Sequence, residues 1–142
     1  MLARSELQVR LSDQGEDQGR IVLVSDPGTE DIIAAALAQT GQAHQDDVEH
    51  AIALFRSRGR DFPTMRSAIV CLAGVLEAER GLLKVELLNK DSGALFDIAN
   101  NFDLRHRKVG QKTDYDPAFL EWLFDWYLST INLVRKLRAT TA

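Results

Sequence analysis

The sequence has little of the chemistry that stabilises secreted or membrane proteins. Its 142 residues include a single cysteine, Cys71, so no intramolecular disulfide can form, which is typical of a reducing compartment. The longest apolar tract, 118–134, is interrupted by Glu121, Asp125 and Asn132 and is shorter than the roughly 20 residues that span a membrane. Residues 1–11 hold no apolar run of the kind found in a secretory signal. These absences predict a cytoplasmic protein that is not anchored in a membrane.

Motifs for metals, nucleotides and covalent catalysis are also missing. There is no Cys-x-x-Cys pair, no Walker A sequence, no G-x-G-x-x-G fingerprint and no serine or cysteine nucleophile motif. His44 and His50 are six residues apart, which places them on opposite faces of a helix and not on one face, as a zinc-binding helix requires. The sequence therefore predicts no metal and no cofactor. A net charge of −4 argues against broad nucleic-acid binding, although a local basic patch can still bind RNA.

The first 25 residues differ in pattern from the rest of the chain. Apolar residues alternate with polar ones from Leu7 to Leu11, and a short β-branched run follows at 21–24 after a polar stretch with two glycines. Alternation with a period of two is typical of a β-hairpin. The alternative is a partly ordered tail, because an isolated hairpin is marginally stable. We therefore divide the chain into an N-terminal hairpin or tail, 1–25, and a helical bundle domain, 26–142.

The remaining sequence is patterned for helices. Apolar residues recur at intervals of three and four between capping residues, prolines and glycines, and they predict helices over about 30–39, 45–58, 62–88, 95–101 and 117–138. Thr29 is the expected cap of the first helix, and Arg56 and Arg58 complement the dipole at the end of the second. One apolar stripe predicts the buried face of the third helix: Met65, Ile69, Leu72 and Leu76.

The last predicted helix is apolar around most of its circumference. A helix of this kind is buried on several sides, either in the centre of a bundle or with one face in a dimer interface, and we expect a homodimer. Trp122 and Trp126, one turn apart, can stack on nucleic-acid bases. The apolar residues around them favour the other interpretation, which is packing in a core or an interface.

The stretch 96–112, with the sequence FDIANNFDLRHRKVGQK, holds the densest group of chemically active side chains. His106 titrates near neutral pH and can transfer a proton, while Arg105 can hold a phosphate that Asn101 orients. Three further cations can extend a nucleic-acid contact: Arg107, Lys108 and Lys112. The alternative is that 105–108 is a basic helix C-terminus, in which His106 is an ordinary cap or pair partner.

The segment 46–83, DDVEHAIALFRSRGRDFPTMRSAIVCLAGVLEAERGLL, followed by the DLRHR sequence at 103–107, resembles the helical C-terminal domain of abortive-infection (AbiJ-like) proteins, which belong to the HEPN group. In that group an aromatic-containing loop precedes an Arg- or Asn-rich helix start. An acidic residue comes late in that helix, and an Ile-Arg-His sequence lies near the end of the next one. Phe62, Arg66, Glu77 and the Leu-Arg-His sequence at 104–106 stand at those places here.

The resemblance implies a four- to five-helix bundle that dimerises and works in bacterial phage-defence or toxin–antitoxin systems. It implies RNA and an antitoxin or other protein as partners. Many HEPN proteins are metal-independent ribonucleases with an arginine several residues before the histidine, but here Asn100 and Asn101 occupy the places upstream of His106.

We therefore predict a mostly α-helical, HEPN-like bundle with a short N-terminal β-hairpin or tail. Its predicted function is that of a non-catalytic dimerisation, adaptor or RNA-binding module in phage defence. The alternative is a metal-independent HEPN-type endoribonuclease. In that enzyme Arg105 holds the phosphate, His106 transfers the proton, and Asn101 and Glu77 orient them.

Overall fold

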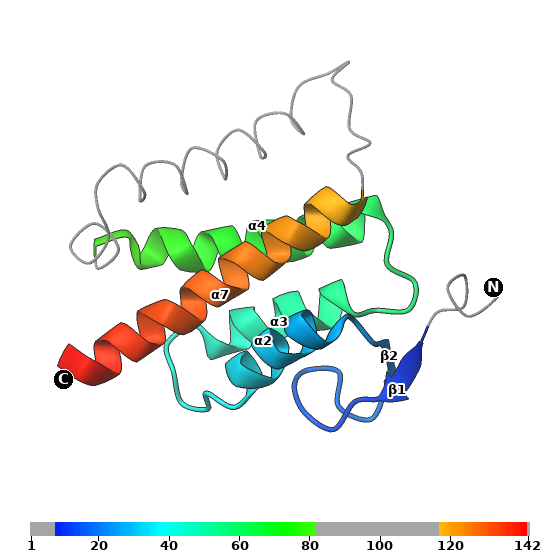
Figure 1. Ribbon diagram of the computed structural model, residues 1–142, viewed down its shortest axis with the longest axis horizontal. Helices are drawn as coiled ribbons and strands as arrows, with labels where there is room; N and C mark the ends of the chain where they lie inside the picture. The colour runs from blue at the N-terminus through cyan, green and yellow to red at the C-terminus, as the bar shows by residue number, and fades with distance from the viewer. Residues whose placement is uncertain (1–7, 82–116, 142) are drawn as a thin grey trace, which may run out of the picture.

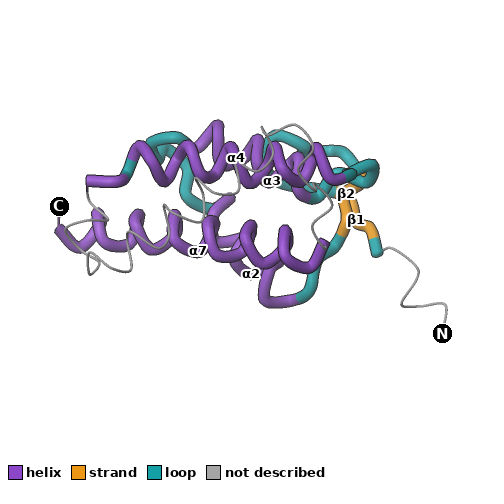
Figure 2. The backbone as a smooth tube through the Cα atoms, turned by 90° about the horizontal axis from the view of Figure 1, so that it is seen from above, coloured by secondary structure: helices purple, strands orange, loops and turns teal. Residues whose placement is uncertain are grey.

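A computed structural model describes residues 8–81 and 117–141 of the chain. Within these ranges the chain forms four helices and one two-stranded antiparallel sheet, so the predicted mostly α-helical class is confirmed. The helices are α2 (Pro27–Leu37), α3 (Gln45–Phe55), α4 (Phe62–Ala78) and α7 (Pro117–Thr141). They lie in two layers, α3 with α4 and α2 with α7, with the sheet at one end (Figure 1, Figure 2).

The predicted hairpin forms within the described part of the N-terminal segment. Strand β1 (Val9–Leu11) pairs antiparallel with β2 (Ile21–Leu23), and Arg10 lies opposite Val22. The second edge of β2 attaches to the end of α3, because the Leu23 amide donates to the carbonyl of Arg56 at 2.8 Å. The hairpin is therefore bonded to the helices and does not stand alone.

Side-chain capping hydrogen bonds mark the first turns of α2 and α4. Asp26 caps α2 by accepting a hydrogen bond from the Thr29 amide at 3.0 Å, and Asp61 caps α4 by accepting one from the Thr64 amide at 2.9 Å. The prediction that Thr29 caps α2 was wrong. Its hydroxyl instead donates to both carboxylate oxygens of Asp125 on α7, each at 2.9 Å. Helix α2 thus begins one turn earlier than predicted, with Pro27 in its first turn.

Helices α2 and α3 end earlier than predicted, α2 at Leu37 and not at 39. Helix α3 ends at Phe55 and not at 58, because the backbone of Arg56 turns away to meet the sheet. Helix α4 ends at Ala78 with Glu79 as its C-cap, and most of the predicted continuation to 88 lies outside the described residues. The predicted helix at 95–101 lies outside the described residues. Helix α7 begins at Pro117, as the sequence predicts.

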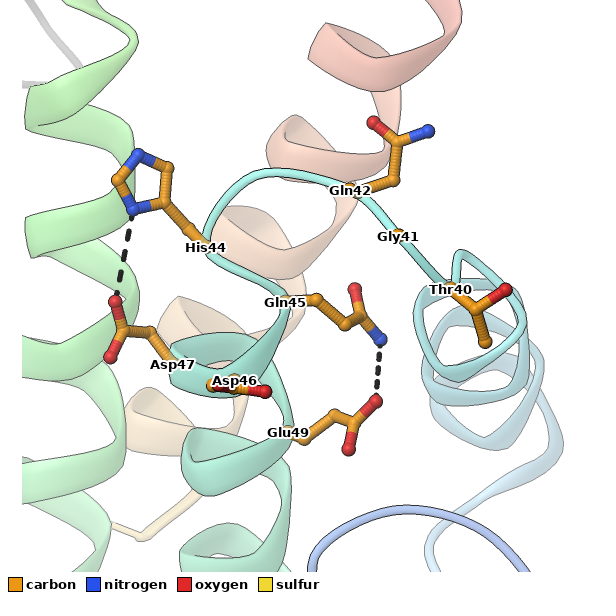
Figure 3. A pocket seen from close by; sticks show the side chains of 8 residues that line it. All are labelled: Thr40, Gly41, Gln42, His44, Gln45, Asp46, Asp47 and Glu49. Atoms are coloured by element: carbon orange, nitrogen blue, oxygen red, sulfur yellow. Dashed lines mark hydrogen bonds and ion pairs between the residues drawn. The ribbon is translucent and has the colours of Figure 1, made fainter.

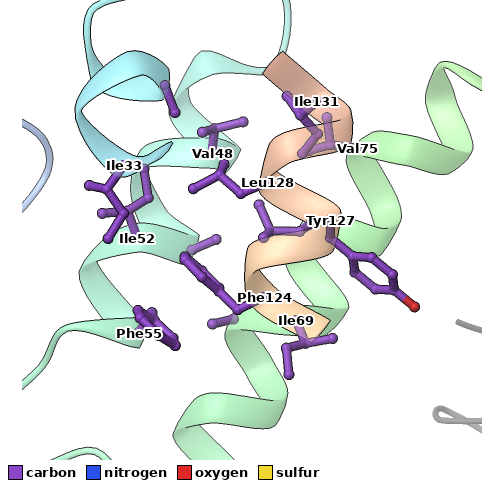
Figure 4. Close-up of a cluster of buried hydrophobic side chains, with 14 of the residues drawn as sticks. Ile33, Val48, Ile52, Phe55, Ile69, Val75, Phe124, Tyr127, Leu128 and Ile131 are labelled. Carbon is purple, nitrogen blue, oxygen red and sulfur yellow. The ribbon is translucent and has the colours of Figure 1, made fainter. Parts of the chain in front are cut away.

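The core lies between the two layers (Figure 4). The predicted stripe of α4 is fully confirmed, since all four of its residues are at most 5% exposed. The rings of Phe55 on α3 and Phe124 on α7 stack with centroids 3.8 Å apart and planes 5° apart, which joins the two layers directly. Apolar side chains from all four helices complete the core: Ile33, Val48, Ile52, Val75, Tyr127, Leu128 and Ile131 among them.

Candidate functional site

Most of the site predicted from the sequence lies outside the described residues. This applies to six side chains: Asn101, Arg105, His106, Arg107, Lys108 and Lys112. Glu77 is the one predicted site residue within the described ranges. It is exposed on α4, and its carboxylate accepts a hydrogen bond from Arg80 at 2.7 Å. Its role in orienting Arg105 and His106 therefore stays a prediction.

The connection between α2 and α3 forms an open hollow of about 610 Å³ (Figure 3). Three carboxylates line it, those of Asp46, Asp47 and Glu49, and His44 lies 3.8 Å from Asp47. The Gln45 amide donates to Glu49 at 2.8 Å. An acidic lining repels phosphate, so this hollow does not suit an RNA backbone. Among residues 8–81 and 117–141 no group of three His, Cys, Asp or Glu side chains is placed to hold a metal ion.

A second cavity, of about 10 Å³, lies where the ends of α4 and α7 meet the α2–α3 connection. It has room for about one water molecule. Glu79 pairs there with Arg138, and the buried Arg135 donates to the Ala43 carbonyl at 3.4 Å. Burial lowers the pKa of Arg135, and the carboxylates of Glu79 and Glu49 act in the opposite direction. The cavity is too small for a substrate, so these charges serve to join the helix ends.

A buried ionic network fixes the hairpin loop to α3. Arg56 is 1% exposed, and its guanidinium donates to Asp17 through Nε at 2.7 Å and through Nη2 at 2.6 Å. Nη2 also donates to the Ser12 hydroxyl at 2.9 Å and to the Gln14 carbonyl at 2.8 Å. Arg56 does lie at the end of α3, where a complement to the helix dipole was predicted, but it is buried and its main contact is with Asp17. No spacing in the sequence could have shown this, because the contact joins residues far apart in the chain.

Helix α7 carries a row of large apolar side chains beside its core-facing side, and one of them, Trp126, packs against the core itself. Phe119 is 36%, Trp122 50% and Leu133 39% exposed, while Trp126 is half-buried. We call these four residues the outer stripe. Its rings follow one another along the helix, with centroids 5.7 Å apart from Phe119 to Trp122 and 5.3 Å apart from Trp122 to Trp126.

Helix α7 has apolar side chains both on its core side and in the outer stripe, in line with the prediction that it is apolar on several sides. The core side of the helix is filled by Leu120, Phe124 and Leu128, each at most 1% exposed. Trp122 was expected in a core or an interface, and half of it is exposed in the single chain. It is therefore not a core residue, and the interface and base-stacking interpretations both stay open. The spacing 119, 122, 126 and 133 is the signal in the sequence that marks one helix face.

Comparison with protein-family models, with curated proteins and with solved structures finds no match to this chain. The resemblance to HEPN domains therefore stays a prediction. None of the helices in the described part of the chain is both long and apolar enough to cross a bilayer.

Proposed function

We propose that the chain is a non-catalytic helical association module, a dimerisation, adaptor or RNA-binding component of a bacterial phage-defence system. The outer stripe of α7 is the observation that carries association. Large apolar side chains in a continuous row on one face mark a surface where another molecule binds. Tryptophan is also the residue type most enriched among those that dominate interface energies.

The acidic side chains near the outer stripe are already bonded within the chain. Glu121 and Asp125 lie on the same half of α7 as Trp122, and Glu121 pairs with Arg60 at 2.9 Å. Asp125 accepts from the Thr29 hydroxyl, so neither carboxylate excludes RNA, and the apolar character of the row is what favours a protein. We assign RNA binding to the basic residues at 105–112. The place in phage defence and an antitoxin-like partner rest on the family resemblance, and a homodimer rests on the pattern of α7.

The lack of catalysis is tested with single-stranded RNA in the presence of a chelator. We expect the purified protein and its His106→Ala variant to leave the RNA intact to the same extent. Cleavage by the unaltered protein that the variant loses would overturn the proposal and support the alternative ribonuclease, with Arg105 and His106 as its catalytic pair. Cleavage that both proteins share equally would come from a contaminating nuclease and would leave the expected equality in place.

The role of the outer stripe is tested in a bacterial host challenged with phage. Protection by the unaltered chain should be lost when Trp122 and Leu133 are both replaced by alanine. Val70→Ala is the matched control, because Val70 is also 36% exposed but lies on α4 outside the stripe. Full protection by the double variant, at equal protein level, would contradict the assignment of function to this surface.

A further inference from the structure

We propose that the small cavity where the ends of α4 and α7 meet the α2–α3 connection is a binding site for one water molecule, which accepts a hydrogen bond from Arg135. The water completes the joint that holds the second half of α7 to its neighbours. The volume of about 10 Å³ is close to the smallest that holds a water molecule. The inference concerns a different place from the outer stripe and is independent of the proposed function.

Arg135 brings a buried donor without an acceptor to this cavity. The residue is only 7% exposed, and its Nη2 donates to the Ala43 carbonyl at 3.4 Å, which is a long hydrogen bond. Its Nη1 is buried and has no hydrogen-bond partner in the part of the chain that the structure describes. A guanidinium can only donate, and a buried donor that stays unpaired destabilises the fold. Because Arg135 lines the cavity, a water bound there lies beside the guanidinium and supplies the missing acceptor.

The cavity also offers acceptors for the two hydrogens of a water molecule. Glu79, which is 8% exposed, and Ala43 both line it. The Glu79 carboxylate pairs with Arg138, but a carboxylate has about four acceptor sites, so this pair does not exhaust it. The Ala43 carbonyl has two lone pairs, and Arg135 uses one of them. A buried water typically makes about three hydrogen bonds, which is the number that Arg135, Glu79 and Ala43 together provide.

Charge and size favour water over a small anion as the occupant. Two arginines, Arg135 and Arg138, line the cavity, and the carboxylates of Glu79 and Glu49 act on Arg135 with the opposite sign. The surroundings are therefore close to neutral, and an anion next to Glu79 would be repelled. A chloride ion is also larger than a water molecule, and the cavity has room for about one water.

A high-resolution crystal structure of the full chain, grown in sodium bromide, identifies the occupant directly. We expect electron density for one water at about 2.7–3.2 Å from Nη1 of Arg135, with no anomalous signal from bromide at that place. A bromide peak in the cavity would overturn the proposal in favour of an anion site. A cavity without electron density would overturn it in favour of an empty one.

A substitution that fills the cavity tests the water in solution. Val75 is buried and forms part of the cavity wall, and Val75→Ile adds one methylene group there. In an empty cavity the added group would gain contacts and raise the midpoint of urea denaturation. If it displaces a water that Arg135 needs, the midpoint should fall instead. Val70→Ile is the matched control, since it makes the same change at an exposed position of α4 and should leave the midpoint nearly unchanged. A midpoint that rises with Val75→Ile would contradict the bound water.

A double-mutant cycle separates loss of the water from simple overpacking. In an Arg135→Met background no guanidinium depends on the water, so Val75→Ile should lower the midpoint less than it does in the unaltered protein. Overpacking would instead lower the midpoint by the same amount in both backgrounds, because the methylene group meets the same wall. Equal losses in the two backgrounds would therefore overturn the proposal.

Discussion

The guanidinium of Arg56 holds the carboxylate of Asp17 through two hydrogen bonds across 39 residues of sequence. The Arg56 side chain is 1% and the Asp17 side chain 6% exposed, so the pair is shielded from water. Ser12 donates to Asp17 at 2.9 Å, which supplies a further partner to the buried carboxylate. This pair fixes the loop between β1 and β2 onto the end of α3.

Removing the Arg56 side chain should destabilise the fold strongly. Arg56→Ala leaves the carboxylate of Asp17 buried without its cation, and we expect the free energy of unfolding to fall by about 3–5 kcal/mol. Urea denaturation followed by circular dichroism measures the change. Arg58→Ala is the matched control, since Arg58 is exposed two residues further on, and it should change stability by less than about 0.5 kcal/mol. Equal effects of the two substitutions would show that the buried pair contributes nothing.

The same pair should make stability depend on acid pH. Burial by itself raises the pKa of Asp17, but the hydrogen bonds from Arg56 and Ser12 and the charge of Arg56 outweigh it, so the pKa lies below its usual value of 3.8. The folded state therefore binds the Asp17 proton less tightly than the unfolded chain does. The resulting stability is present above pH 3.8 and is lost as the pH falls through the pKa of the folded state. Asp17→Asn should lack this part of the acid dependence in urea titrations between about pH 5 and 2.

Replacing Tyr127 by phenylalanine should not weaken the fold. The Tyr127 hydroxyl is fully buried and has no hydrogen-bond partner in the described part of the chain. Removing an unsatisfied buried hydroxyl should raise the free energy of unfolding by about 1 kcal/mol. Thermal unfolding at neutral pH measures this, and a clear loss of stability would show that the hydroxyl has a partner that holds the fold together.

Tyr127 should also make stability fall in alkali. Burial raises the pKa of Tyr127 from 10.0 to about 12. The folded state keeps its proton to higher pH than the unfolded chain does, so stability falls as the pH rises from 10 to about 12. The difference in melting temperature between the unaltered protein and Tyr127→Phe should therefore grow in favour of the variant over this range. A constant difference would contradict the raised pKa.

Two glycines of the hairpin loop should respond differently to alanine. Gly15 and Gly19 both have left-handed backbones, with φ of +94° and +86°, so each substitution should cost about 1–2 kcal/mol. A Cβ at Gly15 would also lie 3.2 Å from Cδ2 of Leu37, whereas none of the described atoms lies within 4 Å of a Cβ at Gly19. Gly15→Ala should therefore be the more destabilising variant in urea denaturation. Equal losses would mean that Leu37 moves aside without cost.

The parts of the fold that could be predicted from the sequence depend on neighbouring residues. Asp61 and Pro63 mark the start of α4, and Pro117 marks the start of α7, because capping and proline act within one turn. Helical spacing likewise identified the buried face of α4. The start of α2 was misplaced because Asp26 and Thr29 are both good caps, and only the packing of Thr29 against Asp125 decides between them.

The parts that could not be predicted depend on contacts between distant residues. In the sequence, Arg56 is an ordinary basic residue at a helix end, because nothing near it shows that the fold places Asp17 beside it. In the sequence, Trp122 is indistinguishable from a core residue. The structure shows that neighbouring positions of α7 fill the core without it. Of the predicted catalytic residues only Glu77 lies in the described part of the chain, so the sequence is the whole basis for the others.

The stacking of Phe55 on Phe124 has a consequence for the order in which the protein is made. The ribosome completes α3 and α4 well before it completes α7, and the ring that covers Phe55 is then not yet synthesised. During that interval the nascent chain presents the apolar sides of both helices to water, a state prone to aggregation. We therefore expect stable folding to begin only once α7 has left the exit tunnel, and truncated nascent chains that lack it to depend on chaperones.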